Sequence, residues 1–440
     1  MLRYVLAVPA LLTALLLSGC ATSETTTTPP PAPSAAVTQP KAQASQAKAA
    51  ESEAVVVKKP ATAKQASYQQ MASTPAASAV VEAVINGYQP LMAEKPLERI
   101  AFGSCLRQGR PQPIWDVINA MTPDLFIFAG DNVYADTEDM AVMRGVYSEL
   151  AARPGFAKLK ASTPILATWD DHDYGVNDGG KDYPKKAESQ REFLEFWGVP
   201  TDSPRYDREG VYHSVIVGPE GQRTQIILLD TRYHRDDLER LPEDQRKHGP
   251  YAERDDQSAT MLGEAQWAWL AEELKKPAEL RLIVSSIQVV ANEHGWERWS
   301  ALPWQRDKLF QTIEDSEAEG VIFLSGDRHH GEVSVCGGTG PYMSVDVTSS
   351  GLNSAGGRII TEENHHRASE NAVGDNHFGL LDIDWSGEYP QVRIRLIDEQ
   401  ERAQFDDSLD TKKLTFTYGE GDTHGRHSET VKAEETAETP

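Results

Sequence analysis

Residues 125–136, LFIFAGDNVYAD, join an unbroken apolar run to an acid and a phenol that follow it at once. The run over 125–129 has no polar residue on either face, which is typical of a strand that is covered on both sides of its sheet. Asp131 and Tyr134 stand where this strand would end. An aspartate in that place commonly caps a helix or forms a turn, so the segment alone indicates a buried strand and leaves its polar end unexplained.

The same pattern, a short apolar run that ends in polar residues, returns along the chain. Amphipathic stretches beginning at Pro113, Gly263 and Trp304 predict helices between several of these runs. This alternation predicts an α/β domain with a largely parallel sheet, or two such sheets packed together. Ligand sites of such folds lie at the carboxyl ends of the strands, so we expect the polar ends to meet. The recurring segments are IAFGSC (100–105), PILATWDDHD (164–173), IILLDTR (226–232), LIVSSIQ (282–288) and VIFLSGDRHH (321–330).

The composition allows a large folded domain and disfavours one class of partner. With 440 residues, of which 39% are hydrophobic, the chain can bury an enzyme-sized core. Its net charge of −24 argues against nucleic acid, because a phosphate backbone needs a basic stripe and none is visible. A small phosphate substrate stays compatible with this charge, since bound metal ions can reverse the field locally.

The two ends of the sequence differ in composition from its middle. Residues 1–20 have an early Arg, an apolar stretch and a small-residue exit, which predicts a secretory signal. The motif LSGC (17–20) resembles a bacterial lipobox, in which Cys20 becomes the lipidated first residue, and Ala21 favours the outer membrane, facing the periplasm. An ordinary signal peptide or a plain membrane anchor is the alternative. We expect a disordered Ala/Thr/Pro-rich tether over 21–90, one folded domain over 91–400 and a charged, flexible tail over 401–440.

The polar strand ends offer donors of a kind that binds metal ions. Carboxylates and a phenolate are hard, charge-rich ligands, and one thiolate and one imidazole add softer ones. A phenol ionises near pH ~10, so binding it as an anion near neutrality requires a strongly acidic cation such as ferric iron. Cys105 has a competing interpretation, a disulfide with Cys336, which is the one pairing left if Cys20 carries lipid.

Several of these motifs together resemble a known family. GDNVY (130–134) matches the GDxxY motif shared by purple acid phosphatases and by the alkaline phosphatase D, or PhoD-like, metallophosphatases. GSC, WDDHD, LDTRYHR and SGDRHH match further blocks of the latter family in the same order. The resemblance covers roughly residues 97–350 and extends more weakly to about residue 398. It implies a sandwich of two mixed β-sheets flanked by helices, with a metal site at the carboxyl edges of the strands.

Carried over residue by residue, the resemblance implies a dinuclear centre. Ferric iron and calcium are the expected ions, and zinc or manganese are less favoured. Oxygen donors at the second position suit calcium better than zinc, which agrees with this expectation. The implied ligands are Cys105, Tyr134 and His329 on the iron side, Asp131 as the bridge between the ions, and Asp171 and Asp327 on the calcium side.

Further residues have expected roles beside the metals. His172 resembles the family's histidine that donates a proton to the leaving group or binds a phosphate oxygen. Arg232 is a candidate clamp for substrate oxygens, because a guanidinium matches phosphate geometry, with an ion pair to a neighbouring acid as the alternative. Gln288 stands where related enzymes have a histidine ligand, which leaves the calcium side incomplete. The loop NEHGWERW (292–299) could wall the pocket, and Trp296 is then either a pocket residue or part of ordinary loop packing.

The predicted function is hydrolysis of phosphate esters by attack of a metal-bound hydroxide on phosphorus, with diesters slightly preferred to monoesters. Small phosphate esters and phospholipids are the expected substrates, and the oligomeric state stays open. A phospholipase D-like enzyme of the same fold is one alternative. A lipoprotein that binds metal or anions without catalysis is another, disfavoured because buried, unpaired carboxylates would destabilise a fold that does not use them.

Overall fold

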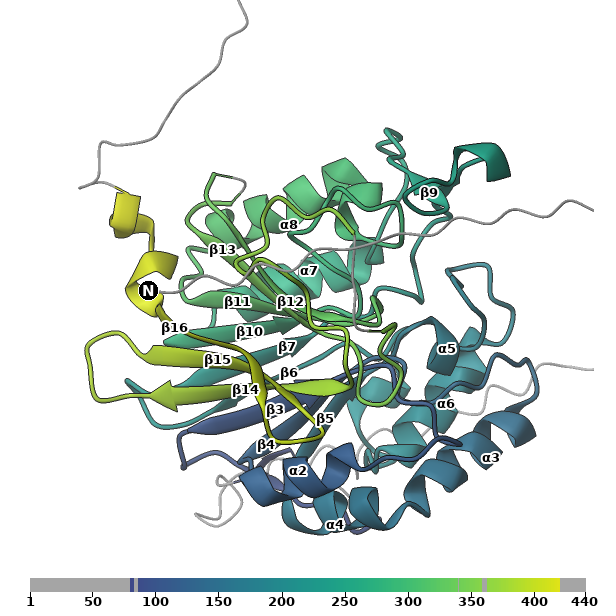
Figure 1. The fold of residues 1–440 in the computed structure, drawn as a ribbon, viewed down its shortest axis with the longest axis horizontal. Helices are drawn as coiled ribbons and strands as arrows, with labels where there is room; N and C mark the ends of the chain where they lie inside the picture. The colour runs from purple at the N-terminus through teal and green to yellow at the C-terminus, as the bar shows by residue number, and fades with distance from the viewer. Residues whose placement is uncertain (1–79, 83–85, 339, 358–361, 420–440) are drawn as a thin grey trace, which may run out of the picture. The chain divides into compact units, whose positions relative to one another are not determined.

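The computed structural model describes residues 80–82, 86–338, 340–357 and 362–419. Its main feature is a pair of six-stranded β-sheets, which Figure 1 shows between two groups of helices. The predicted sandwich of two mixed sheets flanked by helices is confirmed. In spatial order, the first sheet consists of β16 (Ala403–Asp410), β15 (Gln391–Asp398), β14 (His377–Asp384), β3 (Arg99–Gly103), β4 (Leu125–Ala129) and β5 (Ile165–Thr168). The second consists of β12 (Gly331–Cys336), β13 (Ser344–Ser349), β11 (Val321–Ser325), β10 (Leu280–Val284), β7 (Thr224–Leu228) and β6 (His213–Val217).

Each sheet is parallel where strand and helix alternate along the chain. Elsewhere the pairs are antiparallel, except that β13 runs parallel to β11 with β12 and no helix between them. In the first sheet β3, β4 and β5 run parallel, whereas β14, β15 and β16 are antiparallel to their neighbours. In the second sheet β7, β10 and β11 run parallel, and β6 and β12 add antiparallel strands at the two margins. Parallel neighbours need a long crossover connection, and helices occupy the connections between β3, β4 and β5 and between β7, β10 and β11.

The apolar run that opens the predicted site forms β4 and is buried on both faces. Phe126 and Phe128 pack against the helices on the outer face of the first sheet, whereas Leu125 and Ile127 pack between the two sheets. Successive side chains of a strand point to opposite faces of its sheet, so a strand covered on both faces needs an apolar residue at every position. This requirement explains why the run contains no polar residue.

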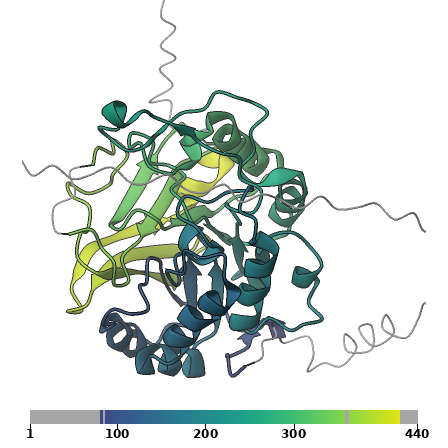
Figure 2. The same cartoon turned by 90° about the vertical axis from the view of Figure 1, so that its right-hand side faces the viewer.

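Helices cover the outer faces of both sheets. Figure 1 shows the two groups on opposite sides of the sheets, and Figure 2, turned by 90°, shows the same separation. On the first sheet, Trp115 contributes to an aromatic cluster with Phe126 and Phe156. The helices of that side are α2 (Ile114–Met121), α3 (Met140–Ala151), α4 (Pro154–Ser162) and α6 (Lys186–Phe196), and those of the second sheet are α7 (Gly263–Leu274) and α8 (Pro303–Asp315).

The first sheet extends past the predicted end of the domain. Residues 391–397 of β15 pair with β16 between residues 403 and 410, and Leu414 beyond it is fully buried. The predicted boundary at residue 400 is therefore too early, because the chain is structured as far as residue 419. Most side chains of β16 are exposed, so its polar sequence is typical of a tail although its backbone completes a sheet. Likewise, β1 (Val80–Glu82), which falls within the predicted tether, pairs with β2 (Leu91–Met92) of the predicted domain.

No helix within the described ranges is both long and apolar enough to pass through a bilayer. The predicted signal peptide and the predicted lipid attachment at Cys20 lie outside the described residues.

The remaining elements of the described chain are short. They are α5 (Asp171–Tyr174), β8 (Glu239–Arg240), β9 (Tyr251–Ala252) and the 3-10 helices η2 (Pro204–Tyr206), η3 (Glu243–Gln245), η4 (Trp299–Ala301), η5 (Thr411–Leu414) and η6 (Phe416–Gly419).

Candidate metal centre

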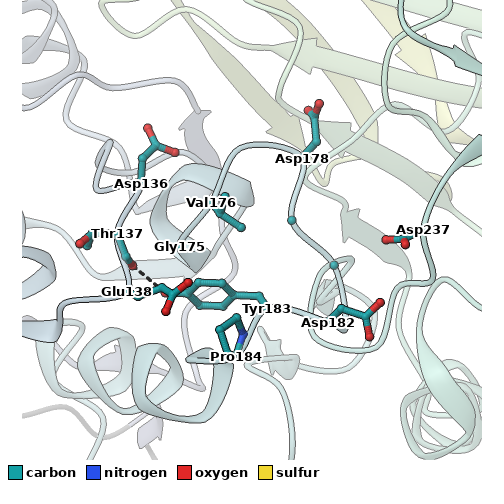
Figure 3. A pocket seen from close by; sticks show the side chains of 12 residues that line it. Asp136, Thr137, Glu138, Gly175, Val176, Asp178, Asp182, Tyr183, Pro184 and Asp237 are labelled. Carbon is teal, nitrogen blue, oxygen red and sulfur yellow. Dashed lines mark hydrogen bonds between the residues drawn. The ribbon is translucent and has the colours of Figure 1, made fainter. Parts of the chain in front are cut away.

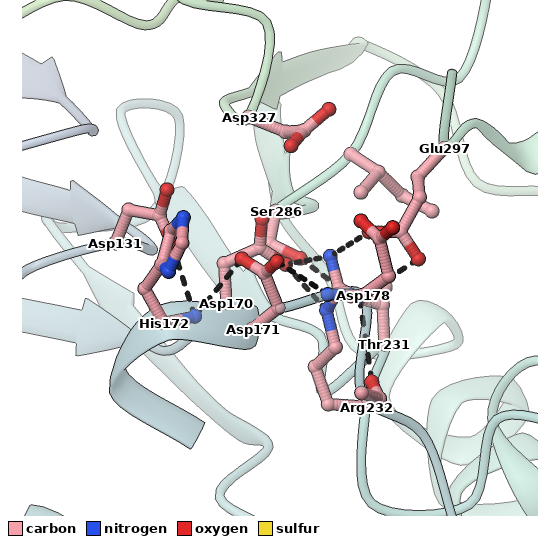
Figure 4. A network of polar contacts seen from close by, with 12 residues as sticks. Asp131, Asp170, Asp171, His172, Asp178, Thr231, Arg232, Ser286, Glu297 and Asp327 are labelled. Atoms are coloured by element: carbon pink, nitrogen blue, oxygen red, sulfur yellow. Dashed lines mark hydrogen bonds and ion pairs between the residues drawn. The ribbon is translucent and has the colours of Figure 1, made fainter. Parts of the chain in front are cut away.

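Segments that follow four different strands bring the predicted ligands to one edge of the two sheets. Cys105 follows β3, Asp131 follows β4, and Asp171 begins α5 directly behind β5. Asp327 and His329 follow β11 of the other sheet. In the view of Figure 4, the carboxylates of the three aspartates lie around a common space. Each sheet therefore supplies part of the centre from the carboxyl ends of its parallel strands.

The backbone adopts a costly conformation at the residues that form this centre. The φ angles of Cys105, Asp131, Asp327 and His329 are 59°, 51°, 66° and 53°. This left-handed region costs about 1–2 kcal/mol for a residue with a Cβ atom. Such conformations persist only where the surrounding structure enforces them, and they cluster at functional sites. Their coincidence at four converging residues supports a functional role for this edge of the sheets.

The residues predicted for the iron side lie close enough to hold one ion. Ligand atoms of Cys105, Asp131 and His329 all lie within 4.8 Å of one another. The Cys105 thiol donates to Oδ2 of Asp131 at 3.5 Å, and Ser350 Oγ lies 3.1 Å from the same sulfur. The hydroxyl of Tyr134 lies 3.0 Å from Nε2 of His329. The fold thus brings together all four residues that were assigned to the iron or to the bridge.

A second group of candidate ligands shares Asp131 with the first. Ligand atoms of Asp131, Asp171 and His172 also lie within 4.8 Å of one another. Asp171 is oriented by the backbone N–H of Asp178, which donates to its Oδ2 at 2.7 Å. Asp327 lines the same cavity of about 540 Å³ as Asp131 and Asp171. A carboxylate that belongs to both groups has the position that a bridging ligand between two ions requires.

The electrostatics of these buried acids fit a bound cation. Burial, and then the negative charges of Asp171 and Cys105, raise the pKa of Asp131 well above its ordinary value. Burial is also the main reason why the pKa values of Tyr134 and Asp327 are raised well above theirs. Acids in such surroundings cannot all ionise in the protein alone, whereas cations among them would favour the charged forms. The donor set of carboxylate, phenol, thiol and imidazole therefore fits metal ions.

His172 is positioned by an acid to which the sequence did not point. Its Nδ1 atom lies 2.7 Å from Oδ1 of Asp136. Burial lowers the pKa of His172, but the hydrogen bond to Asp136 and the charges of Asp171 and Asp136 outweigh burial and raise it to about 8. In the metal-free fold, His172 is therefore largely protonated near neutral pH, and Nε2 is the ring nitrogen that stays available to a ligand.

Arg232 does not reach the cavity. Its side chain is fully buried and forms ion pairs with Asp170 at 2.6 Å and with Glu297 at 2.7 Å. Figure 4 shows Arg232 on the side of Asp170 that faces away from Asp131. This placement does not fit the predicted clamp on substrate oxygens, because the guanidinium is fully buried and is paired with two acids. It fits the alternative, an ion pair with a neighbouring acid.

The side chains of Gln288 and Cys336 do not line the cavity. Gln288 is fully buried and donates to Glu332 at 2.7 Å and to Thr348 at 2.8 Å, so it belongs to a hydrogen-bond network inside the second sheet. Cys105 and Cys336 are both free thiols. Cys336 packs in the apolar layer between the second sheet and its helices. The alternative disulfide is therefore absent, and Cys105 stays available as a ligand.

Several residues of the cavity were not anticipated from the sequence. The guanidinium carbon of Arg107 lies 3.8 Å from the ring centre of Tyr134, and no carboxylate in the described part of the chain pairs with it. Asp178 and Glu297 form a third group of candidate ligands with Asp171, within 4.8 Å of one another. Asp178 lies in YGVNDGG (174–180), a glycine-rich stretch that is typical of a turn. Glu297 belongs to the loop 292–299, which was considered as a pocket wall.

A second cavity, of about 600 Å³, adjoins the centre through Asp178, which lines both. Figure 3 shows the carboxylates around it and Tyr183 along one wall. Among the residues that the structure describes, no Lys or Arg lines this cavity. An anionic group is therefore disfavoured there, and the cavity beside Arg107 is the better place for one. The acids that line the second cavity are Asp136, Glu138, Asp178, Asp182 and Asp237.

Comparison with protein families identifies one match. A family model described as PhoD-like phosphatase matches residues 101–395, which is more than half of the chain. The matched range begins in β3 and ends in β15, so it contains every predicted ligand.

Individual relatives agree with this match. Alkaline phosphatase D of Bacillus subtilis (strain 168) is 26% identical over 187 residues, which cover 38% of this chain and 31% of that protein. The match thus spans about a third of that relative's length. A solved structure described as the structure of PhoD has a TM-score of 0.57 at 17% identity, and the superposition covers 72% of this chain and 69% of the other. At that identity the likeness concerns the fold alone.

Proposed function

The chain belongs to the PhoD-like phosphatase family, and on this premise we propose that it hydrolyses phosphate esters with two bound metal ions, diesters somewhat better than monoesters. The observation that carries the proposal is the carboxylate of Asp131, which belongs to the first two of the three groups of candidate ligands. Two ions that share a ligand are the usual device for transfer of a phosphoryl group to water. Small phosphate esters and phospholipids are the proposed substrates.

The donor chemistry supports an assignment of the two ions. A thiol and a phenol ionise on binding, which favours a strongly acidic ion such as Fe³⁺, whereas a pair of carboxylates suits Ca²⁺. When bound, the ions would supply an activated water nucleophile and positive charge next to the phosphoryl oxygens. The proposed ligands are Cys105, Tyr134 and His329 for iron, Asp171 and Asp327 for calcium, and Asp131 for both.

Two side chains of the cavity support the reaction without binding metal. His172, held by Asp136, is protonated near neutral pH, so its Nε2–H can donate a proton to the oxygen of the leaving group. Arg107 has no acid partner in the described residues and stacks on Tyr134, so its guanidinium can bind the phosphoryl oxygens. Arg107 thus takes the role that the sequence suggested for Arg232.

The substitution Asp131→Asn tests the shared ligand. Protein purified without chelator is analysed for metals and is assayed with bis-p-nitrophenyl phosphate and with p-nitrophenyl phosphate. We expect the wild type to contain iron with an absorption band from phenolate, and Asp131→Asn to lose bound metal and at least about 100-fold in rate. Asp407→Asn, an exposed change on β16, is the matched control.

If Asp131→Asn retained full activity, Asp131 would not be a shared ligand of two catalytic metal ions. Zinc alone in the purified protein would contradict the assignment of the ions, and a strong preference for the monoester would reverse the ranking of substrates.

The N-terminal motif supports an exported protein that is anchored through lipid on Cys20, at the outer membrane and facing the periplasm. Labelling of cells with radioactive palmitate tests this proposal. Label in the wild-type protein and its loss in Cys20→Ser are expected, whereas equal labelling of both would contradict it.

A further inference from the structure

Trp296 is an exposed aromatic side chain on the wall of the metal cavity. It is 46% exposed and lines the same cavity as Asp131 and Asp171. Ligand sites are commonly lined by aromatic side chains beside a few polar groups, so an indole on this wall has the chemistry to contact a ligand. The other large apolar residues of similar exposure in the described ranges are Met92, Val142 and Val176, and none of them lines this cavity. The exposure of Trp296 thus coincides with the place where a substrate would bind.

The indole is held in position by its neighbours. The guanidinium carbon of Arg328 lies 5.3 Å from the centre of its ring, and Arg328 is itself held by Glu362 at 2.6 Å. The backbone N–H of Trp296 donates to Nδ1 of His294 at 3.2 Å, and its carbonyl accepts from Arg298 at 3.1 Å. An aromatic face that is already in place loses little conformational entropy when a ligand binds to it.

Arg328 also connects the indole to the metal centre. Its Nη1 atom lies 3.6 Å from Oδ2 of Asp327, a predicted ligand. One guanidinium group therefore separates the ring of Trp296 from that carboxylate. A phosphoryl group bound beside Asp327 would have its ester substituent within reach of the indole.

We propose that Trp296 binds a flat aromatic ring of the substrate, so that the enzyme favours phosphate esters with such a ring next to the phosphate over ring-free alkyl esters. The inference rests on the proposed phosphoesterase function. Stacked rings attract one another beyond the burial of their area. Exposed indoles also attract ammonium groups, but Arg328 already lies over this ring and would repel a second cation. A neutral ring is therefore the favoured occupant.

Two inhibitors that differ only in the ring test this proposal. Phenylphosphonate and methylphosphonate carry the same charged group and are titrated calorimetrically into metal-loaded protein. We expect the wild type to bind phenylphosphonate about 10-fold more tightly than methylphosphonate, which is within the range known for aromatic stacking. Trp296→Ala should remove this advantage and change binding of methylphosphonate by less than about twofold, whereas Trp296→Phe should retain part of it.

The substitution Val142→Ala on α3 is the matched control, because Val142 is also 46% exposed but lies outside the cavity. It should change neither affinity. An equal loss for both inhibitors in Trp296→Ala would mean that Trp296 supports the cavity as a whole, and it would overturn the proposal. Tighter binding of phosphocholine than of phenylphosphonate, lost in Trp296→Ala, would identify a cationic occupant and would overturn it as well.

Failure of this inference can be told apart from failure of the proposed function. If esters are hydrolysed and methylphosphonate binds, but Trp296→Ala leaves the preference for the phenyl compound unchanged, only the ring-binding role of Trp296 is refuted. If neither phosphonate binds to metal-loaded protein and neither aryl nor alkyl esters are hydrolysed, the phosphoesterase function fails, and the inference fails with it.

Discussion

The hydroxyl of Tyr134 lies 3.0 Å from Nε2 of His329, although 195 residues separate the two in the sequence. Tyr134 follows β4 in the first sheet, and His329 follows β11 in the second. The contact therefore joins the edges of two separate sheets. A metal centre built in this way depends on the apolar layer that holds the sheets together, so its geometry is a property of the whole domain.

Replacement of Tyr134 by Phe should remove the phenol without disturbing the packing around it. If Tyr134 binds iron, we expect loss of the visible phenolate band, a lower iron content and a fall in rate of at least about 10–100-fold, the range known for residues that support metal ligands. Tyr206→Phe, which removes a hydroxyl bonded to the carbonyl of Val199, is the control and should change none of these. An unchanged band in Tyr134→Phe would exclude Tyr134 as a ligand.

Replacement of Asp136 by Asn should change how the rate depends on pH. Burial lowers the pKa of His172, and the hydrogen bond to Asp136 is the first of the effects that raise it to about 8. Without that acid the proton is lost at lower pH, so the alkaline limb of the kcat profile should move down by about one pH unit. Glu138→Gln, in the same second cavity, is the control. If the alkaline limb did not move, Asp136 would not control the pKa of the group that donates the proton.

Removal of the metal ions should make stability depend on pH in a defined direction. The pKa values of Asp131 and Asp327 are raised in the fold, so above pH ~4 these two groups bind more protons in the metal-free folded chain than in the unfolded chain. Their contribution to the free energy of unfolding therefore falls as pH rises toward the folded pKa values. By calorimetry, we expect the Tm of chelated protein to drop by about 2 °C or more between about pH 7 and pH 9, because the buried His294 and His377, whose pKa values are lowered, act in the opposite direction only below that range.

Metal-loaded protein is the comparison for this experiment. Bound cations favour the ionised carboxylates, so its Tm should change less over the same range. If the Tm of the chelated protein rose with pH instead, the pKa values of Asp131 and Asp327 would not be raised in the metal-free fold, and the prediction would be wrong.

Replacement of Arg232 by Met should act on stability more than on substrate binding. Removal of the guanidinium leaves Asp170 buried without its partner, whereas Glu297 keeps its ion pair with Arg235, and breaking a buried pair costs about 3–5 kcal/mol. Arg393→Met, which breaks an exposed pair with Asp406, should cost less than about 1 kcal/mol. Urea unfolding measures both. If Arg232→Met were as stable as the wild type and only its KM were raised, the result would support Arg232 as a residue that binds substrate oxygens.

The sequence predicted the strands and the identity of the candidate ligands because these depend on local patterns. The run over 125–129 is apolar at every position because β4 is covered on both faces, and this can be read without coordinates. Asp131, Tyr134 and Asp171 were identified because motifs of a known family contain them, each within a few residues of a strand end. Patterns that extend over only a few residues were sufficient to predict the strands and these candidate ligands.

The tertiary structure alone decided which polar side chains face the cavity. Arg232 and Arg107 both follow apolar strands closely, yet Arg232 is buried between Asp170 and Glu297, of which Glu297 lies 65 residues away, while Arg107 stacks on Tyr134 at the cavity. The same holds for Trp296, which shares the cavity with ligands from both sheets. The direction of a side chain at a strand end depends on acids and rings contributed by distant segments, and sequence patterns do not contain those distances.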